Sequence, residues 1–197
     1  MNIRWKAELS TTAFNQKQFP PESLPEIAFA GRSNVGKSML LNVLMERKLA
    51  HVGGTPGKTR SVNFYKIKAD KEFFLVDLPG YGYAARGYKE KEQWAALIGQ
   101  YITQRASLRL LVHLVDFRHG LLKKDRELQD WVSQTEVPVL VVFTKADKIS
   151  KGRHTGLLHT YIRQGLKSIE VPFIVSAQSK SGIIELRQFL TNYLNRE

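Results

Sequence analysis

Short apolar runs alternate along the chain with longer stretches in which apolar residues recur at helical spacing. In most of these runs nearly every position is apolar, which is typical of parallel strands that are buried on both faces. Six runs have strand length: EIAFA (26–30), SVNFYKIKA (61–69), EFFLVDL (72–78), LRLLVHLVD (108–116), VPVLVVFTK (137–145) and VPFIVSA (171–177). Only two residues separate the second run from the third, which predicts a tight antiparallel hairpin. The pattern therefore predicts a three-layer α/β fold: a six-stranded, mostly parallel sheet with one antiparallel strand and helices on both faces.

The first 25 residues are less regular than the rest, and FPPESLP (19–25) has the composition of a stiff lead-in. We expect residues 1–25 to pack on a single domain formed by residues 26–197. A chain of 197 residues with 43% apolar and 10% aromatic content can bury a sizeable core. The absence of cysteine excludes disulfides and thiolate metal sites. Because no run has the length of a bilayer span or the form of a secretory signal, we expect a cytoplasmic protein.

Basic residues are in clear excess, with 30 Lys and Arg against 18 Asp and Glu, for a formal charge of +12. They recur along the whole chain, in RGYKEK (86–91), FRHGLLKKDR (117–126) and KISKGRH (148–154), so they do not form a basic tail. One interpretation is a solvated basic surface. The other is a polyanionic partner, because clustered cations release counterions from a phosphate backbone.

The segment GRSNVGKS (31–38) fits the phosphate-loop pattern G-x-x-x-x-G-K-[ST], and it lies between a predicted strand and a predicted helix. Two glycines let successive N–H groups face an anion at the helix N-terminus. The lysine would reach the β- and γ-phosphates and serve catalysis, and the serine hydroxyl would coordinate Mg²⁺. A plain glycine turn with an exposed lysine is the alternative. The predicted phosphate-binding residues are Gly31, Arg32, Ser33, Asn34, Val35, Gly36, Lys37 and Ser38.

The segment DLPGYG (77–82) ends the third predicted strand. Its carboxylate could hold Mg²⁺ through water, and the N–H of Gly80 could approach a γ-phosphate, so the following loop would sense that phosphate. A simple strand-to-turn exit explains the pattern alone equally well. Its position 40 residues after the phosphate-loop lysine strengthens the assignment of Asp77, Leu78, Pro79 and Gly80 to the nucleotide site.

The segment TKAD (144–147) ends the next buried strand and predicts selection of the base. The Asp147 carboxylate can accept two hydrogen bonds from N1–H and the 2-amino group of guanine, whereas adenine offers neither donor at these positions. The Lys145 stem would lie along the base, and the N–H of Ala177 in SAQSKSG (176–182) could meet the guanine O6. The predicted base site comprises Thr144, Lys145, Ala146, Asp147, Val175, Ser176 and Ala177.

These motifs, each at the carboxyl end of a strand, resemble those of the P-loop GTPases. The segments PEIAFAGRSNVGKSMLLN, TPGKTRSVNFY, FFLVDLPGYGYA and VFTKADK resemble the EngB (YihA/YsxC) family of small bacterial GTPases, within the TrmE-Era-EngA-EngB-septin-like superfamily. The resemblance extends from about residue 5 to residue 195. It implies a Ras-like fold, GTP and GDP as ligands, Mg²⁺ as cofactor, and the RNA and proteins of the large ribosomal subunit as partners. Nothing in the sequence suggests an obligate dimer, so we expect a monomer.

The resemblance also assigns residues that the motifs alone do not. In GKTRS (57–61), Thr59 matches the switch threonine whose hydroxyl would join Ser38 on Mg²⁺. Thr144 replaces the asparagine of the common N-K-x-D pattern. Tyr81 stands where other GTPases place a glutamine that orients water, so we expect slow, Mg²⁺-dependent hydrolysis. The switch residues predicted to contact nucleotide are Gly57, Lys58, Thr59, Arg60 and Ser61.

The role of Asn34 stays open between two interpretations. In related GTPases an asparagine here helps to hold a K⁺ ion beside the phosphates, which would make Asn34 a catalytic residue. Alternatively, it only shapes the loop.

Three functions compete. The first is a GTP-hydrolysing switch in assembly of the large ribosomal subunit, and the charge of +12 favours this RNA-rich partner. The second is a GTP-dependent scaffold for cell division and septation, with hydrolysis incidental, since the family has also been linked to division. The third, an ATP-using P-loop kinase or ATPase, is disfavoured by TKAD and by the lack of a recognisable acceptor-substrate domain.

Overall fold

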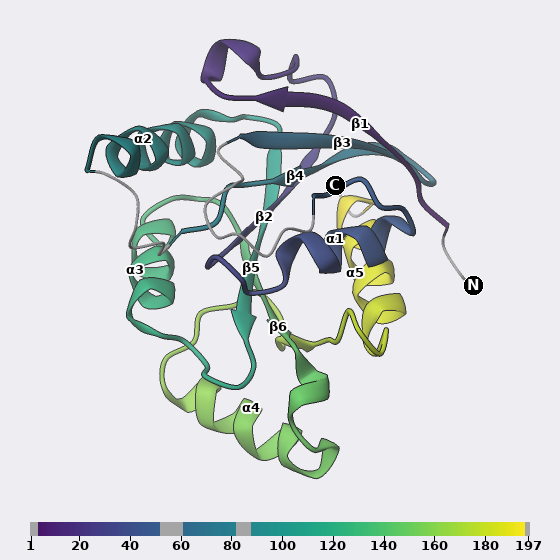
Figure 1. The fold of residues 1–197 in the computed structure, drawn as a ribbon, viewed down its shortest axis with the longest axis vertical. Coiled ribbons are helices and arrows are strands. Elements are labelled where there is room, and N and C mark those ends of the chain that lie inside the picture. The colour runs from purple at the N-terminus through teal and green to yellow at the C-terminus, as the bar shows by residue number, and fades with distance from the viewer. Residues whose placement is uncertain (1–3, 52–60, 82–87, 196–197) are drawn as a thin grey trace.

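The computed structural model describes residues 4–51, 61–81 and 88–195, and a seven-stranded sheet forms its centre (Figure 1). Its strands lie in the order β1-β3-β4-β2-β5-β6-β7. β3 runs antiparallel to both of its neighbours, and all other neighbouring strands pair in parallel. The predicted α/β class with one reversed strand is therefore confirmed. The strands are β1 (Lys6–Ala13), β2 (Glu26–Gly31), β3 (Val62–Lys68), β4 (Glu72–Asp77), β5 (Leu108–Asp116), β6 (Val139–Thr144) and β7 (Phe173–Ile174).

The predicted number of six strands is wrong, because the segment before residue 25 contributes β1 to the sheet. β1 pairs with β3, with a shift of register between Leu9 and Thr11. It is an edge strand on which only Ala7 and Ala13 are buried. Its sequence KAELSTTA therefore lacks the continuous apolar run by which the buried strands were found. Just before it, the buried Trp5 indole donates a hydrogen bond from Nε1 to Thr191 Oγ1 at 3.1 Å.

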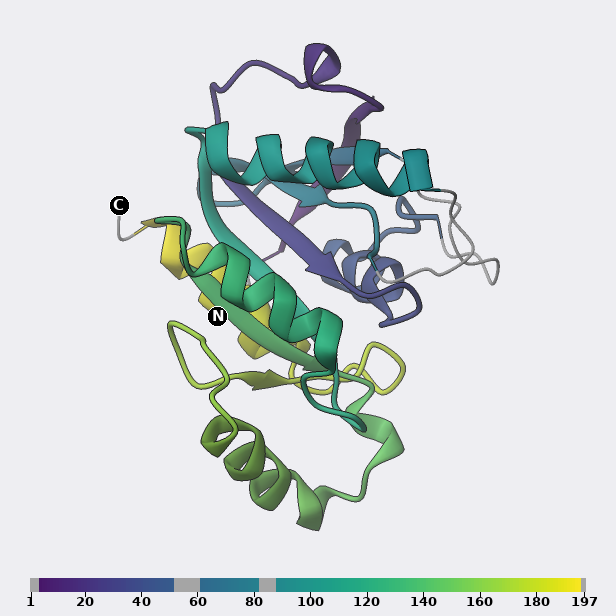
Figure 2. The same cartoon turned by 90° about the vertical axis from the view of Figure 1, so that its left-hand side faces the viewer.

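Helices cover both faces of the sheet, as predicted. Figures 1 and 2 show α1 and α5 on one face, α2 and α3 on the other, and α4 beside β6 at one end of the molecule. One core cluster joins α1 and α5 to the sheet through Leu41 and Leu190, and a second joins α2 to the opposite face through Ile98 and Ile102. The helices are α1 (Lys37–Met45), α2 (Tyr88–Gln104), α3 (Lys123–Val132), α4 (His154–Arg163) and α5 (Ile183–Asn195), with 3-10 turns at Gln16–Gln18, Ala146–Lys148 and Lys151–Arg153.

Strand β2 is buried along its whole length and leads directly into the predicted phosphate loop. It pairs in parallel with β4 and β5, so the carboxyl ends of these strands face the same edge of the sheet. Ligands of open parallel sheets bind at this edge. Gly31 ends β2 under tight packing, since a Cβ there would lie 2.8 Å from Val35 Cγ1 and 3.2 Å from the Leu114 carbonyl oxygen.

The opposite end of β2 begins with a buried carboxylate, Glu26. Tyr101 Oη donates a hydrogen bond to Glu26 Oε2 at 2.7 Å, and Arg105 Nη2 lies 2.6 Å from Glu26 Oε1. This pairing compensates a charge that is excluded from water. Among the described helices, none combines the length and the apolar character needed to cross a membrane.

Candidate nucleotide-binding site

The phosphate loop turns through two residues with left-handed backbone, Asn34 (φ 65°) and Gly36 (φ 99°). Glycine adopts this conformation freely, and asparagine tolerates it better than most residues. The loop ends where α1 begins at Lys37. Gly36, the residue before the helix, has no side chain that could cap the first N–H groups of α1. These donors are therefore available to an anion, as the sequence predicted.

The phosphate-loop lysine and the aspartate of DLPG lie together. The Lys37 ammonium forms an ion pair with Asp77 Oδ1, and the two side chains are only 8% and 2% exposed. Ser38 follows in the first turn of α1. The site thus offers a hydroxyl and a carboxylate, which are oxygen donors of the type that Mg²⁺ binds. Among the described residues, no group of three His, Asp or Glu side chains could hold a metal.

The DLPG turn lies directly against the phosphate loop. The N–H of Tyr81 donates to the Gly31 carbonyl at 3.2 Å, and the N–H of Ser33 donates to the Tyr81 carbonyl at 3.0 Å. Gly80 is so close that an added Cβ would lie 3.2 Å from both the nitrogen and Oγ of Ser33. The structure therefore brings the two phosphate-sensing motifs together. The other two residues of the turn, Leu78 and Pro79, are buried.

The TKAD segment is also bonded to the phosphate loop. Thr144 Oγ1 donates to the carbonyl of Val35 at 2.7 Å, and Lys145 Nζ donates to the carbonyl of Asn34 at 2.6 Å. The Lys145 stem passes the loop closely, because a Cβ on Gly36 would lie 3.9 Å from its Cε. Thr144 therefore makes a side-chain bond to the phosphate loop even though it replaces an asparagine.

A cavity of about 190 Å³ lies between the phosphate loop, TKAD and the loop after β7. Asp147 Oδ1 accepts a hydrogen bond from the buried Ser176 Oγ at 2.6 Å, and this bond lowers the pKa of the carboxyl group. The N–H of Ala146 donates to the Val175 carbonyl at 3.1 Å and holds the two loops together. Six of the predicted residues line the cavity: Gly36, Thr144, Lys145, Asp147, Val175 and Ala177. An anionic acceptor in a cavity of this kind can take two donors from a guanine base.

Sequence reasoning missed Asp116, which ends β5. Burial raises the pKa of its carboxyl group, but hydrogen bonds from Arg118 and Lys145 outweigh burial and lower the pKa well below its usual range. Asp116 Oδ2 lies 3.0 Å from Lys145 Nζ, so it orients the lysine beside the base cavity. An acidic residue at the end of the apolar strand LRLLVHLVD was the available signal.

A second missed group surrounds Arg32 of the phosphate loop. Arg32 Nε lies 3.0 Å from Oδ2 of Asp125, a fully buried carboxylate on α3. The same carboxylate accepts a hydrogen bond from Tyr81 Oη at 2.8 Å. These contacts join residues that are far apart in the sequence, and no contiguous motif could have revealed them.

Four of the predicted switch residues, Gly57, Lys58, Thr59 and Arg60, lie outside the described residues, so the assignment of Thr59 to Mg²⁺ stays a prediction. Ser61 is described: it is buried, and its Oγ donates to Asn63 Oδ1 at 3.3 Å. A larger hollow of about 970 Å³ lies between α1 and α5, but its lining includes none of the predicted site residues. The smaller cavity is therefore the one that fits the predicted chemistry.

The phosphate loop, the DLPG turn and the TKAD cavity on this fold define a P-loop GTPase. A family model described as "50S ribosome-binding GTPase" matches residues 26–145. Two curated relatives share most of their length with this chain, and each is described as "Probable GTP-binding protein EngB". The one from Syntrophomonas wolfei subsp. wolfei is 45% identical over 193 residues, 96% of this chain and 97% of the relative. The one from Clostridioides difficile is 40% identical over 200 residues, 100% of this chain and 96% of the relative.

The chain belongs to the EngB family of GTP-binding proteins, so it is a GTPase that binds GTP and GDP. Solved structures support the fold. A crystal structure of a probable GTP-binding protein EngB has a TM-score of 0.70 at 24% identity, covering 87% of this chain and 100% of that chain. A crystal structure of Era in complex with MgGDPNP and nucleotides 1506–1542 of 16S ribosomal RNA has a TM-score of 0.74 at 23% identity, covering 86% of this chain and 56% of that chain.

Proposed function

We propose that this GTPase is a molecular switch in assembly of the bacterial large ribosomal subunit, acting as a cytoplasmic monomer with Mg²⁺ as cofactor. The observation that carries the proposal is the match of residues 26–145 to a model described as a 50S ribosome-binding GTPase. The charge of +12 supports a polyanionic partner. The alternative is a GTP-dependent scaffold for cell division. Such a scaffold would bind protein partners, and it does not require a strongly basic surface.

The site supports a chemistry based on charge stabilisation. Lys37 would stabilise the charge of the β- and γ-phosphates, while Ser38 and Thr59 would hold Mg²⁺ and Asp77 would reach it through water. When bound, Mg²⁺ neutralises developing phosphoryl charge. Tyr81 Oη is already bonded within the protein, which supports slow intrinsic hydrolysis.

Asn34 would add a K⁺ ion to this chemistry. Its side chain is exposed at the phosphate loop, and its left-handed backbone also fits the simpler role of shaping the loop. Turnover measured in K⁺ and Na⁺ at equal ionic strength separates the two roles. Faster turnover in K⁺, lost in Asn34→Ala, supports the ion site, and equal rates leave the loop-shaping role.

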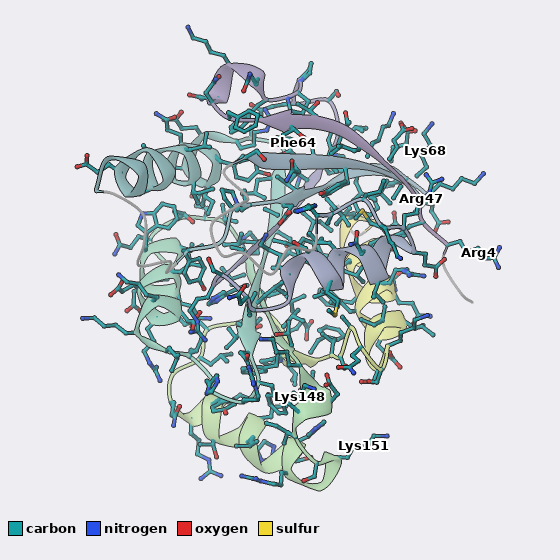
Figure 3. All side chains as sticks on the ribbon, viewed as in Figure 1. Arg4, Arg47, Phe64, Lys68, Lys148 and Lys151 are labelled. Carbon is teal, nitrogen blue, oxygen red and sulfur yellow. The ribbon has the colours of Figure 1, made fainter. Side chains whose placement is uncertain are left out.

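Cations lie on more than one side of the molecule. Figure 3 shows Arg4, Arg47 and Lys68 on the side where β1 begins and β3 ends, and Lys148 and Lys151 near α4. An RNA partner could use either region. The sequence favours the cations beside the switch segments, among them Arg86, which lies outside the described residues, and Lys89, whose side chain does too.

The test is co-sedimentation of the protein with large ribosomal subunits, mature and immature, in the presence of a non-hydrolysable GTP analogue, GDP or no nucleotide. We expect binding to be about tenfold tighter with the analogue, a coupling of about 1.4 kcal/mol, and to fall steeply with added salt. The double variant Arg86→Glu/Lys89→Glu should weaken docking and keep GTP affinity.

The matched control is Lys151→Glu/Arg153→Glu, which makes the same change of charge at two exposed positions near α4. If both double variants weaken docking equally, the protein adheres to RNA by charge alone. Equal affinity in all three nucleotide states would contradict the switch. No binding to subunits at any salt concentration would favour the division scaffold.

A further inference from the structure

A buried polar network joins four parts of the fold around the carboxylate of Asp125. Tyr81, directly after the DLPG turn, has its hydroxyl 2.7 Å from His113 Nε2 on β5 and 2.8 Å from Asp125 Oδ1 on α3. Asp125 Oδ2 lies 3.0 Å from Arg32 Nε of the phosphate loop. His113 and Asp125 are fully buried, and Tyr81 is nearly so. In the nucleotide chemistry described above, these contacts serve only to keep the Tyr81 hydroxyl bonded within the protein.

The directions of the hydrogen bonds follow from the carboxylate, which can only accept. The Tyr81 hydroxyl therefore donates to Asp125, and its oxygen accepts from His113, so the His113 proton lies on Nε2. The second oxygen of Asp125 also accepts from the N–H of Leu122 at 3.0 Å. Burial raises the pKa of Asp125, but the nearby His113 side chain and the hydrogen bond from Tyr81 outweigh burial and lower it. Both carboxylate oxygens thus have donors, and such a network resists opening because a buried charge would lose its partners.

The backbone of Tyr81 is held as firmly as its side chain. Its N–H and its carbonyl bond to Gly31 and Ser33 of the phosphate loop. Residue 81 is therefore tied to β5, α3 and the phosphate loop at once. The preceding residue, Gly80, is in close contact with Ser33 and carries the N–H expected to meet a γ-phosphate. A fixed Tyr81 leaves Gly80 little freedom to drift away from the loop.

We propose that Tyr81, His113 and Asp125 are positioning residues that hold Gly80 against the phosphate loop whichever nucleotide is bound. Residues 80 and 81 then keep the same position in the GTP-bound and GDP-bound states. Because Gly80 is already ordered, its N–H is in position to donate to a γ-phosphate. Binding of GTP therefore does not have to supply the free energy of ordering this residue. The inference rests on the proposed contact of Gly80 with the γ-phosphate. It does not depend on the ribosomal partner.

The central experiment compares two tyrosines whose hydroxyls make the same kind of bond. Tyr81→Phe removes the bond to Asp125, and Tyr101→Phe removes the bond to Glu26, a buried carboxylate paired with Arg105 at the other end of β2. Dissociation constants are measured for a non-hydrolysable GTP analogue and for GDP. We expect Tyr81→Phe to raise the dissociation constant of the analogue by about tenfold, because one hydrogen bond to a charged group is lost. The dissociation constant of GDP should change by less than about twofold. Tyr101→Phe should lower thermal stability to a similar extent and leave the ratio of the two constants as in the wild type.

Substitutions at His113 give an independent test by rescue. His113→Gln keeps an N–H donor near the position of Nε2 and should retain most of the preference for the analogue, whereas His113→Leu should lose it. An unchanged ratio of dissociation constants in Tyr81→Phe would overturn the inference, as would an equal change in Tyr101→Phe. A stronger preference for the analogue in Tyr81→Phe than in the wild type would also overturn the inference. The network would then stabilise the GDP-bound state and break when GTP binds. If the wild type itself binds both nucleotides equally, the proposed sensing by Gly80 fails, which is a different result.

Discussion

The hydroxyl of Thr144 holds the phosphate loop by a hydrogen bond. The substitution Thr144→Val removes this hydroxyl and keeps a side chain of almost the same shape. The hydroxyl donates to the carbonyl of Val35 at 2.7 Å and also lies 3.3 Å from the carbonyl of Val115. All three residues are buried. Valine would leave the Val35 carbonyl without this donor, in a place shielded from water.

The magnitude follows from that burial. A buried polar group that loses its partner costs about 1–3 kcal/mol of stability. In a domain of this size each kcal/mol lowers the melting temperature by about 2–4 °C, so we expect a decrease of about 2–12 °C. The carbonyl also lies between the left-handed residues Asn34 and Gly36, so the loop should lose order. If nucleotide binding must restore 1.4 kcal/mol of that order, GDP affinity falls by about tenfold.

The assay is a thermal melt with and without GDP, together with a direct measurement of the GDP dissociation constant. The control is Thr191→Val in α5, where a buried threonine hydroxyl donates to the Arg187 carbonyl at 3.0 Å. This change should lower the melting temperature without lowering the affinity for GDP. If the two variants bind GDP equally well, the Thr144 bond does not support the phosphate loop, and the reasoning is refuted.

Three further predictions concern charged residues of the site. Asp147→Asn should lower the affinity for GTP by about 10⁴-fold and create a preference for xanthine nucleotides, which carry a carbonyl in place of the 2-amino group. Retention of wild-type GTP affinity would show that Asp147 does not recognise the base. Lys37→Ala should abolish measurable GTP hydrolysis, and a turnover assay that finds wild-type rates would remove Lys37 from catalysis. The lowered pKa of Asp116 implies stability that is present above its unfolded pKa of about 4 and is lost as pH falls further. Denaturant titrations below about pH 4 should therefore show a shallower loss of stability in Asp116→Asn than in the wild type, and equal slopes would argue against the ion pair with Lys145.

The central part of the fold could be predicted because parallel strands buried on both faces have to be apolar at nearly every position. β2, β5 and β6 meet that condition, and the sequence located all three. β1 does not, because an edge strand buries few side chains and its register depends on β3 rather than on its own pattern. Its recruitment to the sheet is a tertiary effect that local periodicity cannot report.

The predicted parts of the site were those written in contiguous motifs. Within a phosphate loop or TKAD, the spacing along the chain already determines which groups face the ligand. Asp116, His113 and Asp125 could not be assigned in this way, because their partners come from other elements of the fold. Thr144 is intermediate: the sequence showed the departure from asparagine, and only the structure shows that its hydroxyl binds the phosphate loop.

The bond between Trp5 and Thr191 has a consequence for how the protein is made. The residue that precedes the first strand is completed by the last helix, 186 positions later. At a synthesis rate of about 5–20 residues per second, the indole waits about 10–40 seconds for its partner. Throughout that interval the apolar surface around Trp5 stays uncovered in the nascent chain, even after the phosphate loop has been synthesised. Synthesis of α5, rather than completion of the nucleotide motifs, is therefore the step that covers this surface.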